Sequence, residues 1–259
     1  MRARAVRSGV AAGLFHEDSG APGAPGPPLV LVHGAGGSLR HWPAAVRRLP
    51  GRRVIALDLP GHGSSPPPAH GSVGACARSV LGLLDALGVD RAAIGGHSMG
   101  GAVALTLALE APGRVAALAL VGTGARLRVA PAILQATADP ERYRGFGEGS
   151  AEVSFGPGAS AALRREFAEG WRAVDAAVAH GDFLACDVFD AMARLGEIRA
   201  PALVVCGTED RLTPPRYSEY LRDHLAGARL ELVPGAGHMV MLEAPEQVAA
   251  AIEGLLAGL

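Results

Sequence analysis

The sequence is poor in aromatic residues and in cysteine, and it has no long apolar segment. Aromatic side chains make up 4% of the residues while 49% are hydrophobic, so we expect a core built mostly from Ala, Leu and Val. Three widely spaced cysteines, Cys76, Cys186 and Cys206, argue against a disulfide framework and predict reduced thiols in a cytoplasmic protein. No run approaches the roughly 18 apolar residues of a membrane span, so no membrane association is expected.

An excess of charge of one sign is also absent. The chain has 24 basic and 25 acidic residues and a net charge of −1, which argues against nucleic acid or an anionic membrane as a partner. The basic residues 1–4 are not followed by a long apolar segment, so we expect no secretory signal. The histidines show no H-E-x-x-H spacing and the cysteines no C-x-x-C spacing, so we predict no metal site.

Short apolar runs alternate with helix-like segments, a pattern typical of an α/β fold with a mostly parallel sheet covered by helices. We expect strands at residues 10–15, 29–33, 54–57, 92–95, 116–121, 202–206 and 229–233. We expect helices at residues 42–49, 72–87, 99–110, 215–225 and 245–256. Residues 20–28 are rich in Gly and Pro and predict a surface loop.

The alternation stops between about residues 125 and 196. This stretch has no convincing buried strand, and it holds amphipathic segments such as residues 159–179 and 186–195. We therefore expect a helical cap at residues 125–196, inserted between two strands of a core that comprises residues 1–124 and 197–259.

Residues 96–100, with the sequence G-H-S-M-G, match the nucleophile-elbow pattern G-x-S-x-G. A short apolar run at residues 92–95 precedes them, and an apolar helix-forming stretch at residues 102–109 follows. A strand, a tight turn and a helix in this order place a serine at a strained bend, with its hydroxyl projecting from the sheet edge. We predict that Ser98 is a nucleophile; the alternative is a serine that caps a helix N-terminus.

A serine nucleophile needs a base to accept its proton and a third group to hold that base. Asp210 ends a Gly-containing loop after one predicted strand, and His238 lies in a glycine-rich loop after the next. The order Ser98, Asp210, His238 is the chain order of one known type of catalytic triad. We therefore predict that His238 is the base and that Asp210 orients it.

Other residues are weaker candidates for these roles. Glu209 is the rival for the acid, whereas the loop at residues 122–125 contains no carboxylate. His33 stands at a predicted strand end, where we expect it to shape the backbone. His62 lies in a loop whose residues are expected to brace the site. His97 precedes the nucleophile and is expected to point its side chain elsewhere.

Acyl transfer by a serine also requires backbone N–H groups aimed at the developing oxyanion. Met99, at the start of the helix after the nucleophile, is the first predicted donor. The glycine-rich residues 33–37 follow an apolar strand, and Ala35 is the second predicted donor; a glycine turn without a ligand is the alternative. The chain has neither G-x-x-x-x-G-K-[ST] nor G-x-G-x-x-G with a downstream acid, so these glycines do not predict phosphate or dinucleotide binding.

In these features the chain resembles the α/β-hydrolase fold enzymes of the capped esterase type, from about residue 10 to residue 256. The motifs that carry the resemblance are residues 33–34 (HG), 58–63 (DLPGHG), 96–101 (GHSMGG), 207–210 (GTED) and 237–238 (GH). The resemblance implies a mostly parallel, eight-stranded sheet with helices on both faces, a serine acyl-enzyme and no cofactor. The cap is the part that it leaves unmatched.

Several chemistries occur on this fold, and three residues bear on the choice. Hydroxynitrile lyases similar to this family carry a lysine directly after the histidine, where this chain has Met239. Cofactor-free haloperoxidase-like members tend to have an aromatic residue where His97 stands, and dehalogenases use Asp in place of Ser98. Carbon–carbon bond hydrolases and receptor-like proteins that retain the triad stay open as alternatives.

The substrate pocket is expected between the sheet edge and the cap. Trp171, Phe167 and Met239 are the predicted substrate-binding residues. Further candidates for the lining are Ala35, Met99, Leu127, Phe155, Phe183 and Met192. Arg126 and Arg128 are candidates to contact an acid substrate; the alternative, which is the commoner case, is that they are exposed surface arginines. No cluster of Arg or Lys in the sequence marks a site for a phosphorylated or coenzyme A-bound substrate. We therefore predict a hydrolase of small, largely apolar esters or lactones; the oligomeric state stays open.

Overall fold

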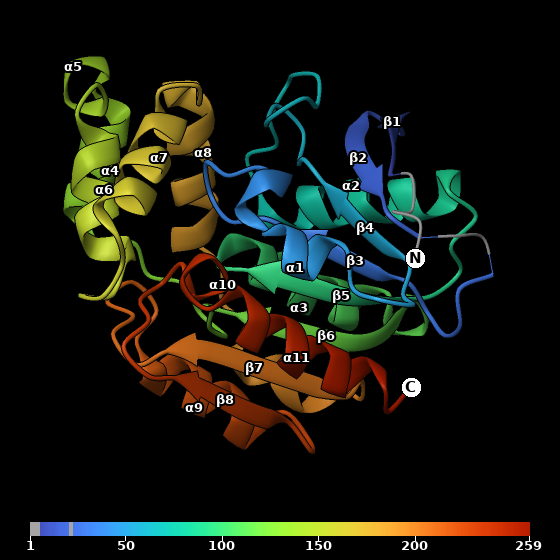
Figure 1. Ribbon diagram of the computed structural model, residues 1–259. Helices are drawn as coiled ribbons and strands as arrows, with labels where there is room; N and C mark the ends of the chain where they lie inside the picture. Colours follow the sequence, from blue (N-terminus) through green and yellow to red (C-terminus); the bar gives the residue numbers. More distant parts are fainter. Residues whose placement is uncertain (1–5, 21–22) are drawn as a thin grey trace.

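One mixed sheet of eight strands forms the centre of the molecule (Figure 1). The computed structural model describes residues 6–20 and 23–259; the basic start of the chain and part of the predicted loop at residues 20–28 lie outside the described residues. The strands are, in sheet order, β1 (Arg7–Ala11), β2 (Leu14–Asp18), β4 (Val54–Leu57), β3 (Leu29–Val32), β5 (Ala92–His97), β6 (Val115–Val121), β7 (Ala202–Gly207) and β8 (Arg229–Val233). The strands from β4 to β8 in this order are parallel to one another. β2 runs antiparallel to both of its neighbours, β1 and β4. The predicted eight-stranded, mostly parallel sheet is confirmed.

Helices cover both faces of the sheet, and the inner strands are apolar throughout for this reason. Every residue of β3, β4, β5, β6 and β7 is buried, which explains their continuous apolar runs. One face is covered by α2 (Val73–Ala86), α3 (Met99–Glu110) and α9 (Pro215–His224). The other face is covered by α1 (Ala44–Arg47), α10 (Val240–Glu243) and α11 (Pro245–Leu256).

A helical segment separates β6 from β7. It contains α4 (Pro131–Ala138), α5 (Pro140–Tyr143), α6 (Phe146–Ser154), α7 (Ala161–Trp171), α8 (Ala176–Asp187) and a 3-10 helix (Met192–Glu197). Figure 1 shows α4 to α8 grouped beyond the carboxyl ends of β5 and β7, toward which the strand arrows point. We call residues 125–196 the cap. Two more 3-10 helices lie outside it, at Leu39–His41 and Pro112–Arg114.

Two predicted elements have the wrong extent. Residues 10–15 are not one strand but the tip of the β1–β2 hairpin, because Ala12 and Gly13 adopt φ angles of 48° and 78°, as a two-residue turn requires. The predicted helix at residues 42–49 is also too long, since α1 has four residues and leaves helical geometry at Arg48 (φ −131°). Both errors lie at short elements, where tertiary context decides the backbone.

Other sequence-based expectations concern cysteines, membranes and metals. Cys76, Cys186 and Cys206 are all buried and unpaired, and burial raises the pKa of Cys76 and of Cys206 to about 12. No helix among the described residues is long and apolar enough to cross a membrane. Within residues 6–20 and 23–259, no group of three or more His, Cys, Asp or Glu side chains is arranged to hold a metal ion.

Candidate active site

Ser98 occupies a strained bend between β5 and α3. Its φ of 52° lies in the left-handed region, which costs a residue other than glycine about 1–3 kcal/mol. The bend tolerates only glycine on either side: a Cβ on Gly96 would lie 2.1 Å from the Gly100 carbonyl oxygen, and one on Gly100 would lie 2.3 Å from the Val32 carbonyl oxygen. Ser98 stands at the N-cap position of α3, but its side chain makes no capping hydrogen bond. The arrangement fits an exposed nucleophile better than a helix cap.

The end of β6 holds the backbone of this bend. The Ser98 N–H donates to the Val121 carbonyl at 3.0 Å, and the Thr123 hydroxyl donates to the Ser98 carbonyl at 2.8 Å. Thr123 is fully buried, and its side chain fills the space in which a Cβ on Gly101 would lie. Residues 122–125 contain no carboxylate, and nothing in their sequence indicates this support for Ser98.

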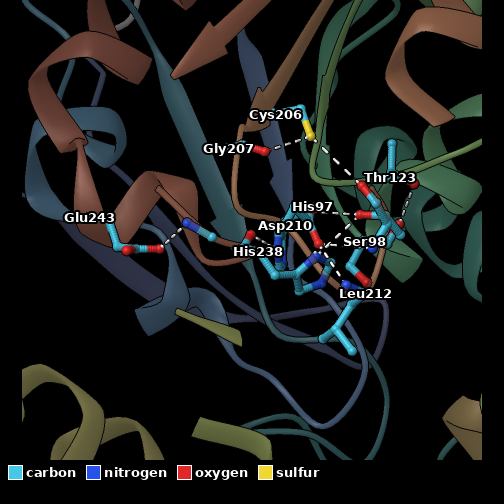
Figure 2. Close-up of polar contacts among 11 residues, drawn as sticks. His97, Ser98, Thr123, Cys206, Gly207, Asp210, Leu212, His238 and Glu243 are labelled. Carbon is cyan, nitrogen blue, oxygen red and sulfur yellow. Dashed lines mark hydrogen bonds and ion pairs between the residues drawn. The ribbon is translucent and has the colours of Figure 1, made fainter. Parts of the chain in front are cut away.

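Asp210 and His238 lie against each other at the ends of β7 and β8. The His238 Nδ1 atom is 2.9 Å from the Asp210 Oδ2 atom (Figure 2). Asp210 also accepts hydrogen bonds from the Thr213 hydroxyl at 2.8 Å and from the Thr213 and Leu212 N–H groups at 2.8 and 2.9 Å. Glu209, the rival for the acid, is exposed. Thr213 is a site residue that the sequence analysis did not identify.

These contacts set the charge state of Asp210. Burial alone raises the pKa of a carboxyl group, but the charge of His238 and the hydrogen bonds from His238 and Thr213 outweigh it and lower the pKa of Asp210 below its ordinary value. Asp210 therefore stays ionised near neutral pH. An ionised Asp210 accepts the Nδ1–H of His238, and this contact leaves the Nε2 lone pair of His238 available as a base.

Three of the other histidines near the site, His33, His62 and His97, have structural contacts. His33 donates from Nδ1 to the Gly34 carbonyl at 2.8 Å and accepts the Leu59 N–H at Nε2, so it shapes the backbone as expected. His62 contacts the Pro60 carbonyl and Asp182. The expectation that His97 points elsewhere is wrong: its Nε2 atom is 3.1 Å from the His238 carbonyl oxygen, and its ring centroid is 4.7 Å from that of His238.

The glycine-rich loop at residues 33–37 lies directly against the nucleophile. A Cβ on Gly34 would lie 3.1 Å from the Cβ atom of Ser98. Among the hydrogen bonds of the described residues, none uses the N–H of Ala35 or of Met99 as a donor. Two free N–H groups on the two segments that adjoin Ser98 are what an oxyanion hole requires.

A cavity of about 360 Å³ opens above Ser98. The core residues that line this cavity include Ser98, His238, Ala35, Met239 and Thr213. No hydrogen bond joins the Ser98 hydroxyl to His238 among the described residues; in structures without substrate such contacts are often long. The nucleophile and the base thus line one pocket of the size of a small-molecule site.

The cap supplies most of the apolar wall of this cavity. Of the predicted lining residues, those from the cap that face the cavity are Leu127, Phe167, Trp171 and Phe183. Phe155, Met192 and Met99 do not line it. Phe155 is fully buried and packs edge-to-face against Phe167, with ring centroids 5.2 Å apart, so it supports the wall from behind.

The chain was compared with known proteins, and residues 29–251 match the Alpha/beta hydrolase family. The chain belongs to this family. The pimeloyl-[acyl-carrier protein] methyl ester esterase of Neisseria meningitidis is 31% identical over 243 residues, which cover 89% of this chain and 93% of that protein. The enol-lactonase of Burkholderia xenovorans has a similar structure, with a TM-score of 0.87 and 25% identity over 97% of this chain and 100% of that chain.

Other relatives are longer than this alpha/beta hydrolase. The dihydrolipoyllysine-residue acetyltransferase component of the acetoin cleaving system of Pseudomonas putida is 36% identical over 247 residues, or 86% of this chain, and the chain spans 61% of its length. The polyketide synthase ThaQ of Burkholderia thailandensis is 37% identical over 233 residues, or 85% of this chain, and the chain spans 11% of its length. The chain thus belongs to the alpha/beta hydrolase family, and relatives that it matches over most of their own length are named as an esterase and an enol-lactonase.

Proposed function

We propose that this protein hydrolyses small, largely apolar carboxylic esters or lactones through an acyl-enzyme formed on Ser98. The observation that carries the proposal is that Ser98, on its strained bend, and His238, held by the buried Asp210, face the same cavity. The esterase and the enol-lactonase named among the similar proteins act on bonds of this class by name, which supports the same reaction here.

In the first half of the reaction, the Ser98 oxygen attacks the ester carbonyl carbon while His238 accepts the hydroxyl proton at Nε2. The negative charge that develops on the carbonyl oxygen is stabilised by the N–H groups of Ala35 and Met99. The tetrahedral intermediate then collapses: the bond to the alcohol oxygen breaks, and the departing alcohol takes the proton from His238. Asp210 remains ionised throughout and stabilises the protonated imidazole.

In the second half, water attacks the acyl-enzyme along the same path. His238 accepts a proton from the water, the bond between the acyl group and the Ser98 oxygen breaks, and the Ser98 oxygen takes that proton back from His238 as the acid is released. A lactone follows the same two steps, but its alcohol remains attached, so the product is a hydroxy acid. Every proton is transferred through His238, and the proposal needs neither a metal nor a cofactor.

The core and the cap have different roles in this mechanism. The reacting groups come from the core, residues 1–124 and 197–259, while the cap, residues 125–196, encloses the acyl group. Phe167 and Trp171 of the cap and Met239 of the core are proposed as substrate contacts, because each of them lines the cavity. A cap that excludes water lets binding energy act in the transition state.

The test combines a substrate panel with a covalent probe. Nitrophenyl esters of increasing acyl length measure turnover, and a fluorophosphonate probe labels an activated serine. The wild type should hydrolyse the short and medium esters and should be labelled on Ser98, whereas Ser98→Ala should remain folded, unlabelled and inactive. A chelator should leave the activity unchanged.

Each other outcome assigns a different role. Labelling that persists in Ser98→Ala contradicts the nucleophile assignment. Labelling of the wild type without turnover of any ester favours a binding protein that retains the triad. Cleavage of a diketone without turnover of any ester favours a carbon–carbon bond hydrolase.

A further inference from the structure

A buried carboxylate connects the cap to the loop that carries Ala35. Asp182 lies in α8 and is 1% exposed. Its Oδ2 atom accepts a hydrogen bond from the Gly36 N–H at 2.8 Å and lies 2.8 Å from the His62 Nε2 atom. Both partners belong to the core, more than a hundred residues away in sequence. None of the reaction steps described above uses Asp182.

Gly36 is held between two residues of the cap. Its φ of +58° favours glycine, and a Cβ at this position would lie 2.1 Å from the Trp171 ring. The Trp171 ring therefore packs directly on the Gly36 backbone, while Asp182 accepts the N–H of the same residue. The Gly36 N–H belongs to the peptide group that follows Ala35, the proposed oxyanion donor. This peptide group is joined through the Ala35 Cα to the one that carries the Ala35 N–H, so the contact with Asp182 restrains the loop directly beside the donor.

His62 holds Asp182 in place from the other side. The Nδ1 atom of His62 is 3.0 Å from the Pro60 carbonyl oxygen, so both ring nitrogens face acceptors and the ring is a double donor. Burial lowers the pKa of His62, but the hydrogen bond and the negative charge of Asp182 outweigh it and raise the pKa. The other titratable neighbours of His62 are Asp58, His41 and His33, and the ring centroid of His33 is 5.0 Å from that of His62.

We propose that Asp182 is a positioning residue for the oxyanion hole: by binding the Gly36 N–H from the cap, it holds the loop segment that carries the Ala35 N–H in the position that the oxyanion requires. This inference rests on the proposed function. It makes the cap part of the catalytic geometry as well as a wall of the cavity. A nucleophile and a base on the core alone would then lack a complete site for the oxyanion.

Asp182→Ala tests this proposal, with Asp182→Asn and Asp175→Ala as matched variants. In Asp182→Ala, kcat for a small activated ester should fall about ten- to a hundredfold with little change in KM, because a misplaced donor weakens transition-state binding. Fluorophosphonate labelling should slow in parallel, since it develops the same charge on oxygen. Asp182→Asn keeps an oxygen for the Gly36 N–H and should stay within about threefold of the wild type.

Asp175→Ala controls for helix stability. Asp175 caps the N-terminus of the same helix by accepting the Ala177 N–H at 2.8 Å, so its loss should lower the melting temperature without a large change in kcat. Wild-type kcat and labelling in a folded Asp182→Ala would overturn the proposal, as would an equal loss in Asp182→Asn. The two proposals fail separately. Ester turnover by the wild type tests the proposed function, whereas the role of Asp182 is tested by the kcat and the labelling rate of the variant relative to those of the wild type. The labelling rate can be measured without ester turnover.

A second inference comes from the rim of the cavity, where the structure brings together three arginines. Arg128, Arg211 and Arg216 are exposed and line the cavity that contains Ser98. None of them forms an ion pair with a carboxylate of the described residues. Arg128 donates to the Asp187 carbonyl at 2.9 Å, and Arg216 lies 5.3 Å from the ring centroid of Tyr217. No Asp or Glu of the described residues lines the cavity.

Two helix N-termini add to the positive potential at this rim. The residues that precede α4 and α9, Ala130 and Pro214, both line the cavity. Neither helix has an acidic residue in its first turn or a side-chain cap, so their positive ends remain uncompensated. The sequence analysis found no such cluster, because Arg128 is more than eighty positions from the other two arginines.

From this rim we infer that the preferred substrate carries an anionic group, a carboxylate or a phosphate, at a distance from the ester bond. The apolar wall would hold the chain between the two groups. This inference also rests on the proposed function. The net charge of the whole chain is −1, so the preference would arise from the local rim rather than from a basic protein.

Matched neutral and charged esters test the rim. Nitrophenyl hexanoate and nitrophenyl hemiadipate differ in a terminal carboxylate on the acyl side, and ethyl hexanoate and phosphoethyl hexanoate differ in a phosphate on the alcohol side. The wild type should prefer the charged member of one pair, and added salt should reduce that preference. Arg128→Gln, Arg211→Gln or Arg216→Gln should each lower kcat/KM for that charged ester about two- to fivefold and leave its neutral partner unchanged.

Arg126→Gln is the matched control. Arg126 is exposed and only two positions from Arg128, but it pairs with Asp190 at 3.8 Å and does not line the cavity. It should leave both members of each pair unchanged. Preference for the neutral member in both pairs, or equal losses in Arg126→Gln and the rim variants, would overturn the inference, while hydrolysis of the neutral esters still supports the proposed function.

Discussion

The molecule contains two buried histidine–aspartate pairs of nearly the same length but with different surroundings. His238 and Asp210 are 2.9 Å apart, and both come from loops at the end of the sheet. His62 and Asp182 are 2.8 Å apart, and they join a core loop to the cap. His238 lines the cavity, whereas His62 does not.

The difference lies in the second nitrogen of each ring. His62 faces an acceptor on both sides, the Pro60 carbonyl and Asp182, so neither nitrogen is free to take up a proton from a substrate. His238 uses Nδ1 for Asp210, and no hydrogen bond among the described residues involves its Nε2 atom. A histidine–aspartate pair can therefore supply a general base or a purely structural contact. Which of the two it supplies depends on whether one ring nitrogen remains free and faces the cavity.

The largest expected effect comes from the pair beside Ser98. Asp210→Asn removes the acceptor that holds the proton on Nδ1, so kcat should fall by about 10⁴ while the protein stays folded. Steady-state kinetics on a nitrophenyl ester measure the change. Glu209→Gln is the control and should be close to the wild type, because Glu209 is exposed. An active Asp210→Asn with an inactive Glu209→Gln would assign the acid role to Glu209.

The second pair should affect stability more than chemistry. His62→Gln leaves Asp182 as an unpaired carboxylate in a buried site, which typically costs about 3–5 kcal/mol in the free energy of unfolding. Denaturant unfolding measures this loss. The Gly36 N–H keeps its acceptor in this variant, so kcat at low temperature should fall much less than in Asp210→Asn. An unchanged free energy of unfolding in His62→Gln would contradict the structural role of the His62–Asp182 pair.

The two pairs should also respond to pH in opposite directions. The pKa of His62 is raised, so its stabilising contribution is complete below the unfolded value of about 6.5 and is lost as the pH rises through the folded pKa. The pKa of Asp210 is lowered, so its contribution is present above its unfolded value and is lost as the pH falls through the folded pKa. We therefore expect the melting temperature of the wild type to fall more steeply than that of His62→Gln as the pH rises above about 6.5. Identical pH dependences of the two melting temperatures would refute the contribution of His62.

A smaller effect is expected from the hydroxyl group that supports Asp210. Thr213→Val keeps the shape and the backbone N–H contact but removes the hydrogen bond to the Asp210 Oδ2 atom, which is 2.8 Å long. A hydrogen bond to a charged group contributes about 1.5–3 kcal/mol, so kcat should fall at least about tenfold if the bond persists in the transition state. Thr137→Val, a cap threonine that bonds the Ile133 carbonyl, should not change kcat.

The smallest effect concerns acyl length. Phe183 lines the cavity and stacks on Trp171, with ring centroids 6.1 Å apart, but the ring nearest to a Cβ built on Gly36 is that of Trp171. Phe183→Ala should shift the preference toward longer acyl chains by severalfold. Trp171→Ala should do the same and also lower kcat for every ester, because it removes the packing on Gly36. An equal fall for all esters in both variants, with lowered melting temperatures, would leave the two rings a purely structural role.

The sequence predicted what lies directly after the parallel strands. Ser98, Asp210 and His238 each follow an apolar run, and the carboxyl ends of parallel strands meet at one edge of a sheet. Contacts that depend on the packing of the cap could not be predicted in this way. Asp182 lies among apolar residues in the middle of α8, which is a signal of a buried polar contact, but its partner Gly36 is 146 positions away. The hairpin at residues 10–15 was missed because its turn contains a non-glycine residue with positive φ.

Gly36 also limits how this enzyme can be re-engineered. The cap lines much of the cavity, while the proposed reacting groups lie in the core, so exchange of the cap is one way to change the pocket. A foreign cap would have to supply an aromatic ring that packs on the Gly36 backbone, as Trp171 does, and an acceptor for the Gly36 N–H, as Asp182 does. A chimera chosen for pocket shape alone would bind its ester and leave the loop of Ala35 unsupported.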